Sequence, residues 1–540
     1  YALVQVNVRG TGCSGGSFDA FEPLQGLDGY DVIETVAVQD WSANVGMFGI
    51  SYPGIMQLGV AATRPPSLAA IAPLSVIDSV QSVLYPGGIY NNGFGQAWTR
   101  QVSQQAGASG QAWTVDRIAA GDQRCEDNQR WRDHNPDLVS LTRETPFRNA
   151  LTDERSPDVE RIDVPVYLAG AWQDEQTGGR FPSLIPRFEN APVVRATLYN
   201  GLHVDPLGPT VLGGLIEFYD LFVAERVPDL DVVTRFLAGA GLSTVFDAPL
   251  GSLALPPDRF VGSSLDEARQ VYEREPGVRI LFEQGATEPG LPVTHFDASF
   301  DQWPPSELQP VRWYLDATAS SGALTESPAA PTTVAYTTDP DEGARVIVPD
   351  LDRIWTATPG WDWQRSNGAL TFTTEPFATD VVMVGPASAD LRVAVDGTDG
   401  DIEVTLSSIG PEGSETYIQN GWLRLSQRQL DDDATDLRPT PSHLSDDVAL
   451  LEPGVFVPAR VEILPFAQVF RAGTRLRLTI DTPGNSRPQW TFDILDEPVR
   501  ITVATGGADG SSLLMPVVPG IEPPDDGPAC GALRGQPCRG

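Results

Sequence analysis

The sequence predicts an α/β protein followed by an all-β domain. Apolar runs typical of buried strands alternate with helical patterns up to residue 74 and again between residues 164 and 224. This alternation indicates a mainly parallel sheet that is covered by helices on both faces. From about residue 280 short strands follow one another; Leu391, Val393 and Val395, for example, alternate with polar or small residues. That pattern indicates a β-sandwich.

The change of pattern along the chain divides its 540 residues into six expected segments. These are a first part of the α/β domain at 1–77, an inserted helical cap at 78–158, a second part of the α/β domain at 159–235, a connecting segment at 236–279, the β-sandwich at 280–515 and a Pro- and Gly-rich tail at 516–540.

The charge composition excludes several classes of partner and of chemistry. A formal charge of -36 and a pI of about 4.3 argue against nucleic acid or an anionic membrane as partner, since both require clustered positive charge. The sequence contains no lysine, which excludes Schiff-base chemistry and Ser-Lys dyads and leaves four histidines as candidate bases. No apolar run approaches the roughly 20 residues of a membrane span.

The four cysteines indicate an oxidising compartment. Cys530 and Cys538 bracket a short loop, and we expect a disulfide between them. A second bridge between Cys13 and Cys125 is compatible with the sequence, but spacing alone does not establish it. The disulfide predicts a secreted or extracellular protein. No signal peptide precedes the strand pattern at Tyr1, so we expect a processed or truncated chain.

The first strand is expected at Ala2–Val8, before a glycine-rich stretch, Arg9–Gly16, that contains G-x-G-x-x-G. A dinucleotide site would require a helix that begins on these glycines. Residues 18–26 show no helical period and contain Pro23, so a plain loop is the better interpretation. We expect the first helix to begin at Asp28 and to end before Trp41.

The most informative stretch surrounds Ser51. An apolar strand, 45–50, ends at this serine, and a helical pattern follows it as far as Pro65. A serine between Gly49 and Gly54 at such a junction is typical of a nucleophile elbow, although the spacing is G-x-S-x-x-G and not G-x-S-x-G. The residue after the serine, Tyr52, can then direct its backbone N–H at a developing oxyanion.

Two later strands supply partners for this serine. The strand at 164–170 leads to Asp174, and the strand at 193–199 leads to His203. Catalytic groups of open α/β sheets collect at the carboxyl ends of strands, and the order serine, acid, histidine is the one used by such sheets. His134 falls in the expected cap, and the other two histidines, His295 and His443, fall at or beyond the sandwich boundary.

Other candidate features favour structural interpretations. The acidic loops 396–401 and 431–433 could bind calcium, but solvated turns are the better interpretation, and no pair of histidines has the spacing of metal ligands. Three cap tryptophans, Trp98, Trp113 and Trp131, are expected in the core more than in a substrate wall.

The chain resembles the X-prolyl dipeptidyl peptidase and cocaine esterase (CocE/NonD-like) group of serine hydrolases. The matching stretches are 9–12 (RGTG), Trp41 with 44–52 (NVGMFGISY), 171–174 (AWQD) and 201–203 (GLH). The resemblance implies an α/β-hydrolase domain with a helical cap and a jelly-roll domain. It also implies that Ser51 is the nucleophile, His203 the general base, Asp174 its orienting acid and the Tyr52 N–H one oxyanion donor.

Two departures from this group matter for function. The second oxyanion donor of the group is a tyrosine hydroxyl on a loop upstream of the strand that opens this chain, so we expect a fragment. The absent strand would lie between Ala2–Val8 and the elbow strand, and loss of one donor typically costs ~10²–10³ in rate. Secondly, Glu175 is followed by Gln176 and Thr177 where relatives that bind a free α-amino group carry carboxylates. A preference for amino-acid esters is therefore not expected.

These observations predict a serine hydrolase without cofactor or metal that cleaves a small-molecule or peptide ester or amide through an acyl-enzyme. A carboxylesterase, an acylase and an X-Pro dipeptidyl peptidase all fit. The alternative is a weak or inactive hydrolase scaffold whose β-sandwich binds carbohydrate or protein. The sequence does not determine the oligomeric state.

Overall fold

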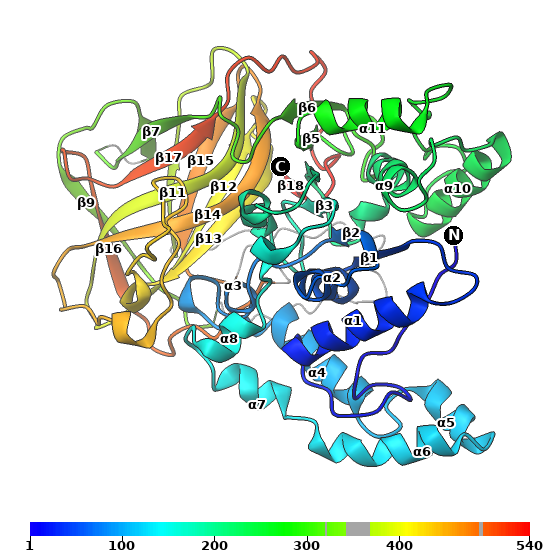
Figure 1. Ribbon diagram of the computed structural model, residues 1–540. Coiled ribbons are helices and arrows are strands. Elements are labelled where there is room, and N and C mark those ends of the chain that lie inside the picture. The colour runs from blue at the N-terminus through cyan, green and yellow to red at the C-terminus, as the bar shows by residue number, and fades with distance from the viewer. Residues whose placement is uncertain (319–320, 342–367, 485–489) are drawn as a thin grey trace.

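The computed structural model describes residues 1–318, 321–341, 368–484 and 490–540, so parts of the expected β-sandwich lie outside the described residues. Two sheets organise the molecule. A smaller sheet with its covering helices lies on the right of Figure 1, a larger sheet lies on the left, and the helices of the cap lie below.

The helices are α1 Pro23–Ala37, α2 Tyr52–Ala62, α3 Val80–Leu84, α4 Phe94–Ala106, α5 Ala112–Ala119, α6 Gln123–Gln129, α7 Leu138–Arg143, α8 Ala150–Glu154, α9 Pro209–Phe222, α10 Val232–Val245 and α11 Leu265–Arg274. The strands are β1 Val45–Ile50, β2 Leu68–Leu74, β3 Val166–Ala171, β4 Val194–Tyr199, β5 Val278–Phe282, β6 Phe296–Phe300, β7 Gln309–Asp316, β8 Gly322–Thr325, β9 Thr332–Thr337, β10 Ala369–Thr373, β11 Val381–Val395, β12 Asp401–Ile409, β13 Glu415–Arg424, β14 Val457–Phe470, β15 Arg475–Asp481, β16 Arg500–Thr505, β17 Ser512–Val517 and β18 Cys538–Arg539.

The smaller sheet is the expected α/β layer. Strands β1 to β5 run parallel in chain order, and β6 pairs antiparallel with β5. Because side chains alternate along a strand, each strand is buried on both faces. Ile71 and Leu168 pack with residues of α1 and α2, whereas Ala70 and Tyr167 pack with residues of α9 and α11. The carboxyl ends of β1 to β4 therefore lie along one edge.

Residues 1–8 do not form the expected strand. They hydrogen-bond to no strand of the sheet, β1 is the edge strand, and Leu3 and Val6 are 73% and 57% exposed. An apolar run becomes a strand only where a neighbouring strand supplies hydrogen bonds and a buried face. Neither is supplied to this segment by the described residues.

Two helices also differ from the expectation. The first helix begins at Pro23 and not at Asp28. Proline is well tolerated in the first helical turn, because backbone N–H groups there have no acceptor within the helix and proline lacks this group. The connecting segment expected at 236–279 contains most of α10, which was not expected, whereas α11 agrees with the helical pattern of the sequence around residues 265–275. Glycines within α10 and the prolines that follow it masked the helical pattern of α10.

The cap comprises α3 to α8, between β2 and β3, as expected. A disulfide joins Cys13 of the glycine-rich loop to Cys125 of α6. The buried guanidinium of Arg132 donates hydrogen bonds to the carbonyl oxygens of Gly12, Ser14 and Gly16. Because the loop presents carbonyls to an arginine, it serves as an attachment point for the cap, which agrees with its interpretation as a plain loop.

The second sheet begins later than expected. Both β5 and β6 belong to the smaller sheet, so the change of layer falls between β6 and β7, and the expected boundary at residue 280 is wrong. Short strands alone do not reveal which sheet they join. Strands β7 to β18 of the described residues form one hydrogen-bonded sheet, in which β11 and β14 pair along most of their length. The jelly-roll order itself stays a prediction.

The last residues do not form a free tail. Val517 ends β17, β18 pairs with β13, and the side chains of Leu533, Arg534 and Gln536 are buried. The expected disulfide between Cys530 and Cys538 is present. The expectation of a tail was wrong because proline and glycine also occur in buried, irregular segments whose backbone is hydrogen-bonded by neighbouring elements.

Candidate active site

Ser51 occupies a strained turn between β1 and α2. Its φ and ψ are 65° and -130°, a conformation that costs a non-glycine residue of the order of 1–3 kcal/mol. Its backbone N–H donates to the carbonyl oxygen of Leu74 at 2.9 Å. This is the geometry of a nucleophile elbow, in which the turn raises the serine side chain above the sheet edge.

The unusual spacing of glycines follows from contacts of this turn. A Cβ on Gly49 would lie 2.6 Å from Cβ of Pro53, and a Cβ on Gly54 would lie 2.7 Å from the Leu74 carbonyl oxygen. Gly54 therefore allows α2 to approach β2 closely. The required close approach is three residues after Ser51, which accounts for G-x-S-x-x-G.

His203 and Asp174 form a buried pair at the ends of β4 and β3. Nδ1 of His203 lies 3.0 and 2.9 Å from Oδ1 and Oδ2 of Asp174. The N–H groups of Gln176 and Thr177 both donate to Oδ1 of Asp174 at 2.8 Å. The backbone N–H of His203 donates to Oε2 of Glu175 at 2.9 Å. The structure thus brings together the predicted acid and base.

The electrostatics of this pair favour charge separation. Burial alone would lower the pKa of His203, but the charge and hydrogen bond of Asp174, followed by the charges of Glu175 and Asp205, raise it above its ordinary value. Burial tends to raise the pKa of Asp174, yet His203 and the Thr177 N–H lower it overall. The pKa of Glu175 is raised by burial and by the charge of Asp174. Asp174 therefore stabilises a protonated imidazole.

Residues at the end of β2 connect Ser51 to the turn that carries His203. Ser75 follows β2, and its hydroxyl donates to the His203 carbonyl oxygen at 2.8 Å, while the preceding Leu74 accepts the Ser51 N–H. Among the described residues no hydrogen bond joins the Ser51 hydroxyl to His203. Catalytic hydrogen bonds are often long before substrate binds, so the triad roles of these residues stay predictions.

The Tyr52 backbone N–H lies at the first position of α2, where N–H groups have no acceptor within the helix. This position agrees with the predicted oxyanion donor. The side chain of Tyr52 has another task, because its hydroxyl donates to Gln25 at 2.6 Å and its ring stacks on Phe21. Burial raises the pKa of this hydroxyl.

A narrow pocket of about 100 Å³ opens beside Ser51. Most of its wall is apolar and comes from the cap and from the loop before α1. The lining includes Phe21, Ile55, Ile77, Val80, Val83, Leu84, Phe94, Trp98, Leu138, Leu141 and Leu151. Trp98 stacks on Phe21 with 5.6 Å between ring centroids, so it belongs to this wall. Trp113 and Trp131 are 39% and 53% exposed, and the expectation of buried core positions is wrong for both.

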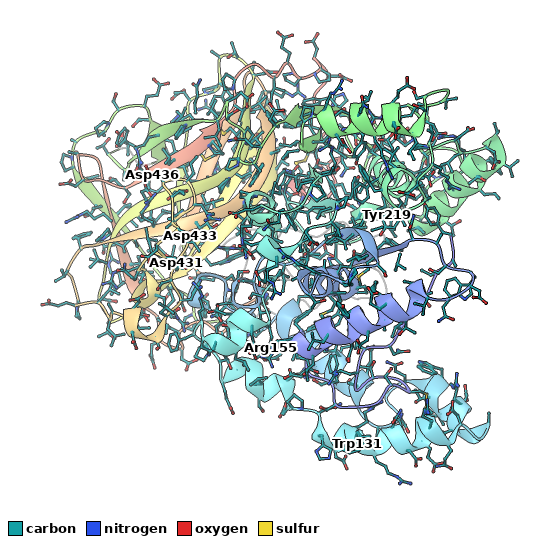
Figure 2. All side chains as sticks on the ribbon, in the orientation of Figure 1. Trp131, Arg155, Tyr219, Asp431, Asp433 and Asp436 are labelled. Atoms are coloured by element: carbon teal, nitrogen blue, oxygen red, sulfur yellow. A yellow bond between two sulfur atoms is a disulfide. The ribbon has the colours of Figure 1, made fainter. Side chains whose placement is uncertain are left out.

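The charged groups of the pocket neutralise each other. Arg155 follows α8 and is labelled in Figure 2; its Nη2 lies 2.6 Å from Oδ2 of Asp19. Nε of Arg155 and Oδ1 of Asp19 have no hydrogen-bond partner among the described residues. Gln176 and Thr177, the neutral residues after the acid, also line the pocket. The pocket thus combines an apolar wall with one neutral ion pair.

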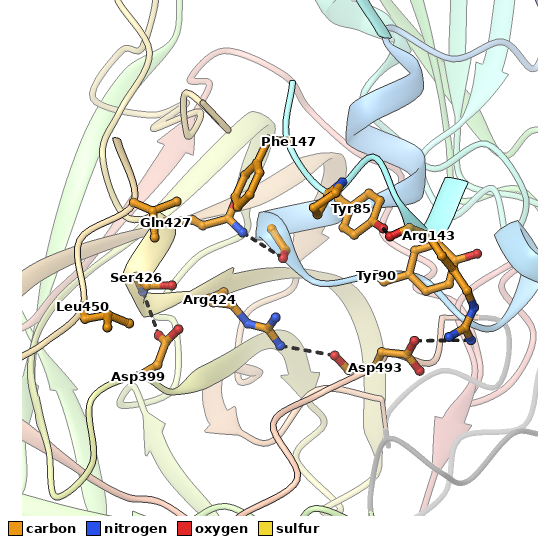
Figure 3. Close-up of a pocket in the computed structure, with 13 residues that line it drawn as sticks. Tyr85, Tyr90, Arg143, Phe147, Asp399, Arg424, Ser426, Gln427, Leu450 and Asp493 are labelled. Atoms are coloured by element: carbon orange, nitrogen blue, oxygen red, sulfur yellow. Dashed lines mark hydrogen bonds and ion pairs between the residues drawn. The ribbon is translucent and has the colours of Figure 1, made fainter. Parts of the chain in front are cut away.

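A second pocket, of about 410 Å³, lies between the cap and the larger sheet (Figure 3). Its charged residues largely satisfy one another. Arg143 pairs with Asp493, Arg424 donates to the Asp493 carbonyl oxygen, and the Ser426 N–H donates to Asp399. This satisfied network provides no sign of catalytic chemistry.

The remaining histidines lie in structural settings. His295 bonds to Glu283, and His443 is buried beside Gln427, where burial, followed by the charges of Arg180 and Arg148, lowers its pKa to about 3. His134 packs against Trp131 in the cap.

The acidic loop near residue 431 pairs with arginines. Asp431, Asp433 and Asp436 (Figure 2) face Arg148, Arg438 and Arg460 respectively. Across the described ranges no three histidine, cysteine or acidic side chains converge as metal ligands. Within those ranges no helix is both long and apolar enough to cross a bilayer.

Sequence reasoning missed the residues that support the site from a distance. Gln173 donates to the Ile418 carbonyl oxygen of β13, and Asp205 forms an ion pair with Arg534. These partners lie more than two hundred residues apart in the chain. A pairing of this kind leaves no local signal in the sequence.

Comparison with known families agrees with this geometry. Residues 1–205 match the family model described as X-Pro dipeptidyl-peptidase (S15 family). Residues 270–490 match the model described as X-Pro dipeptidyl-peptidase C-terminal non-catalytic domain. A protein of Mycobacterium bovis that is named as a serine esterase is 24% identical over 526 residues, which are 89% of this chain and 78% of that protein.

Solved structures share the fold. A CocE/NonD family hydrolase from Staphylococcus aureus superposes with a TM-score of 0.68 at 19% identity and covers 95% of this chain and 78% of its own. An α-amino acid ester hydrolase superposes with a TM-score of 0.62 at 16% identity over 94% of this chain and 84% of its own. At this identity the similarity shows a common fold.

The contacts of Gly54 predict the effect of a methyl group there. We expect Gly54→Ala to lower the free energy of unfolding by about 1–3 kcal/mol, because the new Cβ overlaps the Leu74 carbonyl oxygen. The matched control is Gly59→Ala in the same helix, where the nearest atom is Met56 Cε at 3.7 Å and alanine improves helix propensity. Urea unfolding measures both, and equal effects would contradict the packing argument.

The raised pKa of His203 predicts the pH profile. The predicted base, His203, can accept a proton only when it is neutral. Its raised pKa should therefore delay activity to higher pH, and we expect the acid limb of kcat/KM to have its midpoint above about 6.5. Asp174→Asn removes the charge that raises the pKa, so it should move the midpoint down and lower kcat by about 10⁴-fold. A wild-type midpoint at or below about 6.5 would contradict this description.

Proposed function

Because the chain belongs to the X-Pro dipeptidyl-peptidase S15 family and is a serine hydrolase, we propose that it cleaves esters of small, neutral, apolar acids through an acyl-enzyme on Ser51. The observation that carries this proposal is the strained serine in the lining of an apolar pocket, on the edge that also holds the His203–Asp174 pair.

In the proposed reaction the Ser51 hydroxyl oxygen attacks the ester carbonyl carbon while Nε2 of His203 takes the hydroxyl proton. The Tyr52 N–H donates to the resulting oxyanion. The protonated His203, stabilised by Asp174, then returns the proton to the leaving alcohol as the carbon–oxygen bond breaks. Water then attacks the acyl-enzyme carbonyl carbon while His203 takes a proton from it. The bond to the Ser51 oxygen breaks, so that the acid is released and Ser51 regains its proton from His203.

The pocket supports the choice of substrate class. Its volume of about 100 Å³ is below the 150 Å³ of a cavity that holds benzene, so it suits a group of a few carbon atoms. Its ion pair adds no net charge, since Asp19 is already bound to Arg155. A free α-ammonium group would need an unpaired carboxylate, and Gln176 and Thr177 offer none. These features favour neutral esters over X-Pro peptides and amino-acid esters.

The direct test is labelling with a fluorophosphonate probe. We expect the probe to modify Ser51, identified by mass spectrometry of the labelled peptide, and Ser51→Ala to abolish labelling at that peptide. A folded chain that remains unlabelled would reject the catalytic role of Ser51 and favour a weak or inactive scaffold. Hydrolysis of p-nitrophenyl esters compared with Xaa-Pro anilides then separates an esterase from a dipeptidyl peptidase.

Trp98 should limit the length of the acyl chain. Trp98→Ala removes a wall of the pocket, so we expect the preferred p-nitrophenyl ester to lengthen by roughly two to four carbon atoms, since a buried CH₂ is worth about 0.8 kcal/mol. The matched control is Trp131→Ala, which changes an exposed tryptophan of the same cap and should leave the preference unaltered. Identical chain-length profiles for wild type and Trp98→Ala would show that substrate binds elsewhere.

We also propose that the protein works outside the reducing cytosol, since both cysteine pairs form disulfides that such compartments preserve. Thiol alkylation of the protein isolated from its source tests this proposal. Four free thiols would contradict it.

A further inference from the structure

The disulfide-closed loop at residues 530–538 contacts the turn that carries His203. Its backbone forms hydrogen bonds with the loops after β4 and β5. The Arg534 N–H donates to the Gln284 carbonyl oxygen at 2.9 Å, and Nδ2 of Asn200 donates to the Arg534 carbonyl oxygen at 2.9 Å. The strand β18 pairs with β13 of the larger sheet, and the chain end lies near the middle of the molecule in Figure 1. The loop is thus part of the active-site edge.

Arg534 makes a buried, multiply hydrogen-bonded ion pair with Asp205. Its Nε lies 3.0 and 2.9 Å from the two carboxylate oxygens, and its Nη2 lies 2.8 Å from Oδ1. The Nη1 group donates to the Gly290 carbonyl oxygen at 2.9 Å. Arg534 is 5% exposed and Asp205 is fully buried. Removal of one partner would leave an unpaired buried charge.

Asp205 in turn shapes the His203 turn. Its Oδ2 accepts the Leu202 N–H at 2.7 Å, which closes the turn that contains His203. Space here is minimal, because a Cβ on Gly201 would lie 2.5 Å from Oδ2 of Asp205, and a Cβ on Gly535 would lie 2.4 Å from the Gly201 carbonyl oxygen. Contact therefore runs without a gap from the C-terminal loop to the histidine.

One member of this pair, Asp205, also contributes negative charge near His203. The charged groups that raise the pKa of His203 are Asp174 and Glu175 from the loop after β3, and Asp205 from its own turn. The positive charge of Arg534 lies beside Asp205 and compensates the negative charge of its carboxylate. Tyr199, at the end of β4, stays neutral because burial raises the pKa of its hydroxyl.

We propose that Arg534 is a positioning residue for His203, and that the disulfide-closed loop holds it against Asp205 to fix both the place and the charge environment of the base. This inference rests on the proposed function, since it assigns His203 as the base. It makes the C-terminal loop a component of catalysis, although it contributes no group that touches substrate.

The charge argument predicts shifts of opposite sign. Arg534→Gln leaves Asp205 uncompensated, so we expect the acid limb of the reaction at Ser51 to move to higher pH by about half a unit or more. Asp205→Asn removes the negative charge and should move it to lower pH. The double variant removes one charge of each sign, so its acid limb should return near the wild-type position with a maximal rate reduced by up to about 10²-fold through misplacement.

The measurement is the rate of fluorophosphonate labelling of Ser51 against pH, in the full chain, with circular dichroism to verify folding. The matched control is Arg471→Gln, which breaks a comparable bidentate pair, with Glu283 after β5, but does not contact the His203 turn. We expect it to lower stability without moving the acid limb. Arg534→Lys retains the charge and should keep the wild-type limb, with a lower maximal rate.

The outcomes separate the two proposals. An unlabelled wild type rejects the proposed function. A labelled wild type whose acid limb is unchanged in Arg534→Gln and Asp205→Asn rejects the positioning role, as does an equal shift in Arg471→Gln. If Arg534→Gln fails to fold, Arg534→Lys and Asp205→Asn decide: a wild-type limb and rate in both would reject the inference. The disulfide is tested with Cys530→Ser/Cys538→Ser, which should resemble the double variant in rate.

Discussion

The buried contact between Asp174 and His203 is the constraint on which the rest of the site depends. A carboxylate removed from water is costly unless hydrogen bonds and opposite charge replace the lost solvation. Two backbone N–H groups and the imidazole supply them to Asp174. The side chain of the neighbouring Glu175 accepts a hydrogen bond from the His203 backbone N–H and thereby fixes the histidine backbone. Each of these contacts requires the loops after β3 and β4 to hold one conformation.

The larger sheet is a brace for those loops. Gln173, next to the acid, donates to the Ile418 carbonyl oxygen of β13, and Gln419 donates to the Trp172 carbonyl oxygen at 2.8 Å. Arg180 forms an ion pair with Glu462 of β14 across the same interface. The larger sheet therefore helps to hold the loop that carries Asp174, because β13 forms hydrogen bonds with the two residues that precede this acid.

Local patterns failed where a neighbour decides the conformation. Residues 1–8 have the composition of a strand but gain no partner, whereas the Pro- and Gly-rich residues near 534 are buried because β13 and the His203 turn surround them. Trp98 and Trp131 both belong to the cap, yet one lines the Ser51 pocket and the other is exposed. The difference in exposure between the two tryptophans arises from which part of the cap lies against the Ser51 edge of the smaller sheet.

The sequence by itself determined the parallel α/β sheet, the cap, the later all-β domain and the places of Ser51, Asp174 and His203. Strand periodicity and the glycines of the elbow are local requirements of the backbone, so they are visible in the sequence. Only the tertiary structure decided that Arg534 compensates Asp205, that the Asp19–Arg155 pair neutralises the pocket and that β5 and β6 belong to the first sheet. These features depend on distance in space between residues far apart in the chain, which no local pattern encodes.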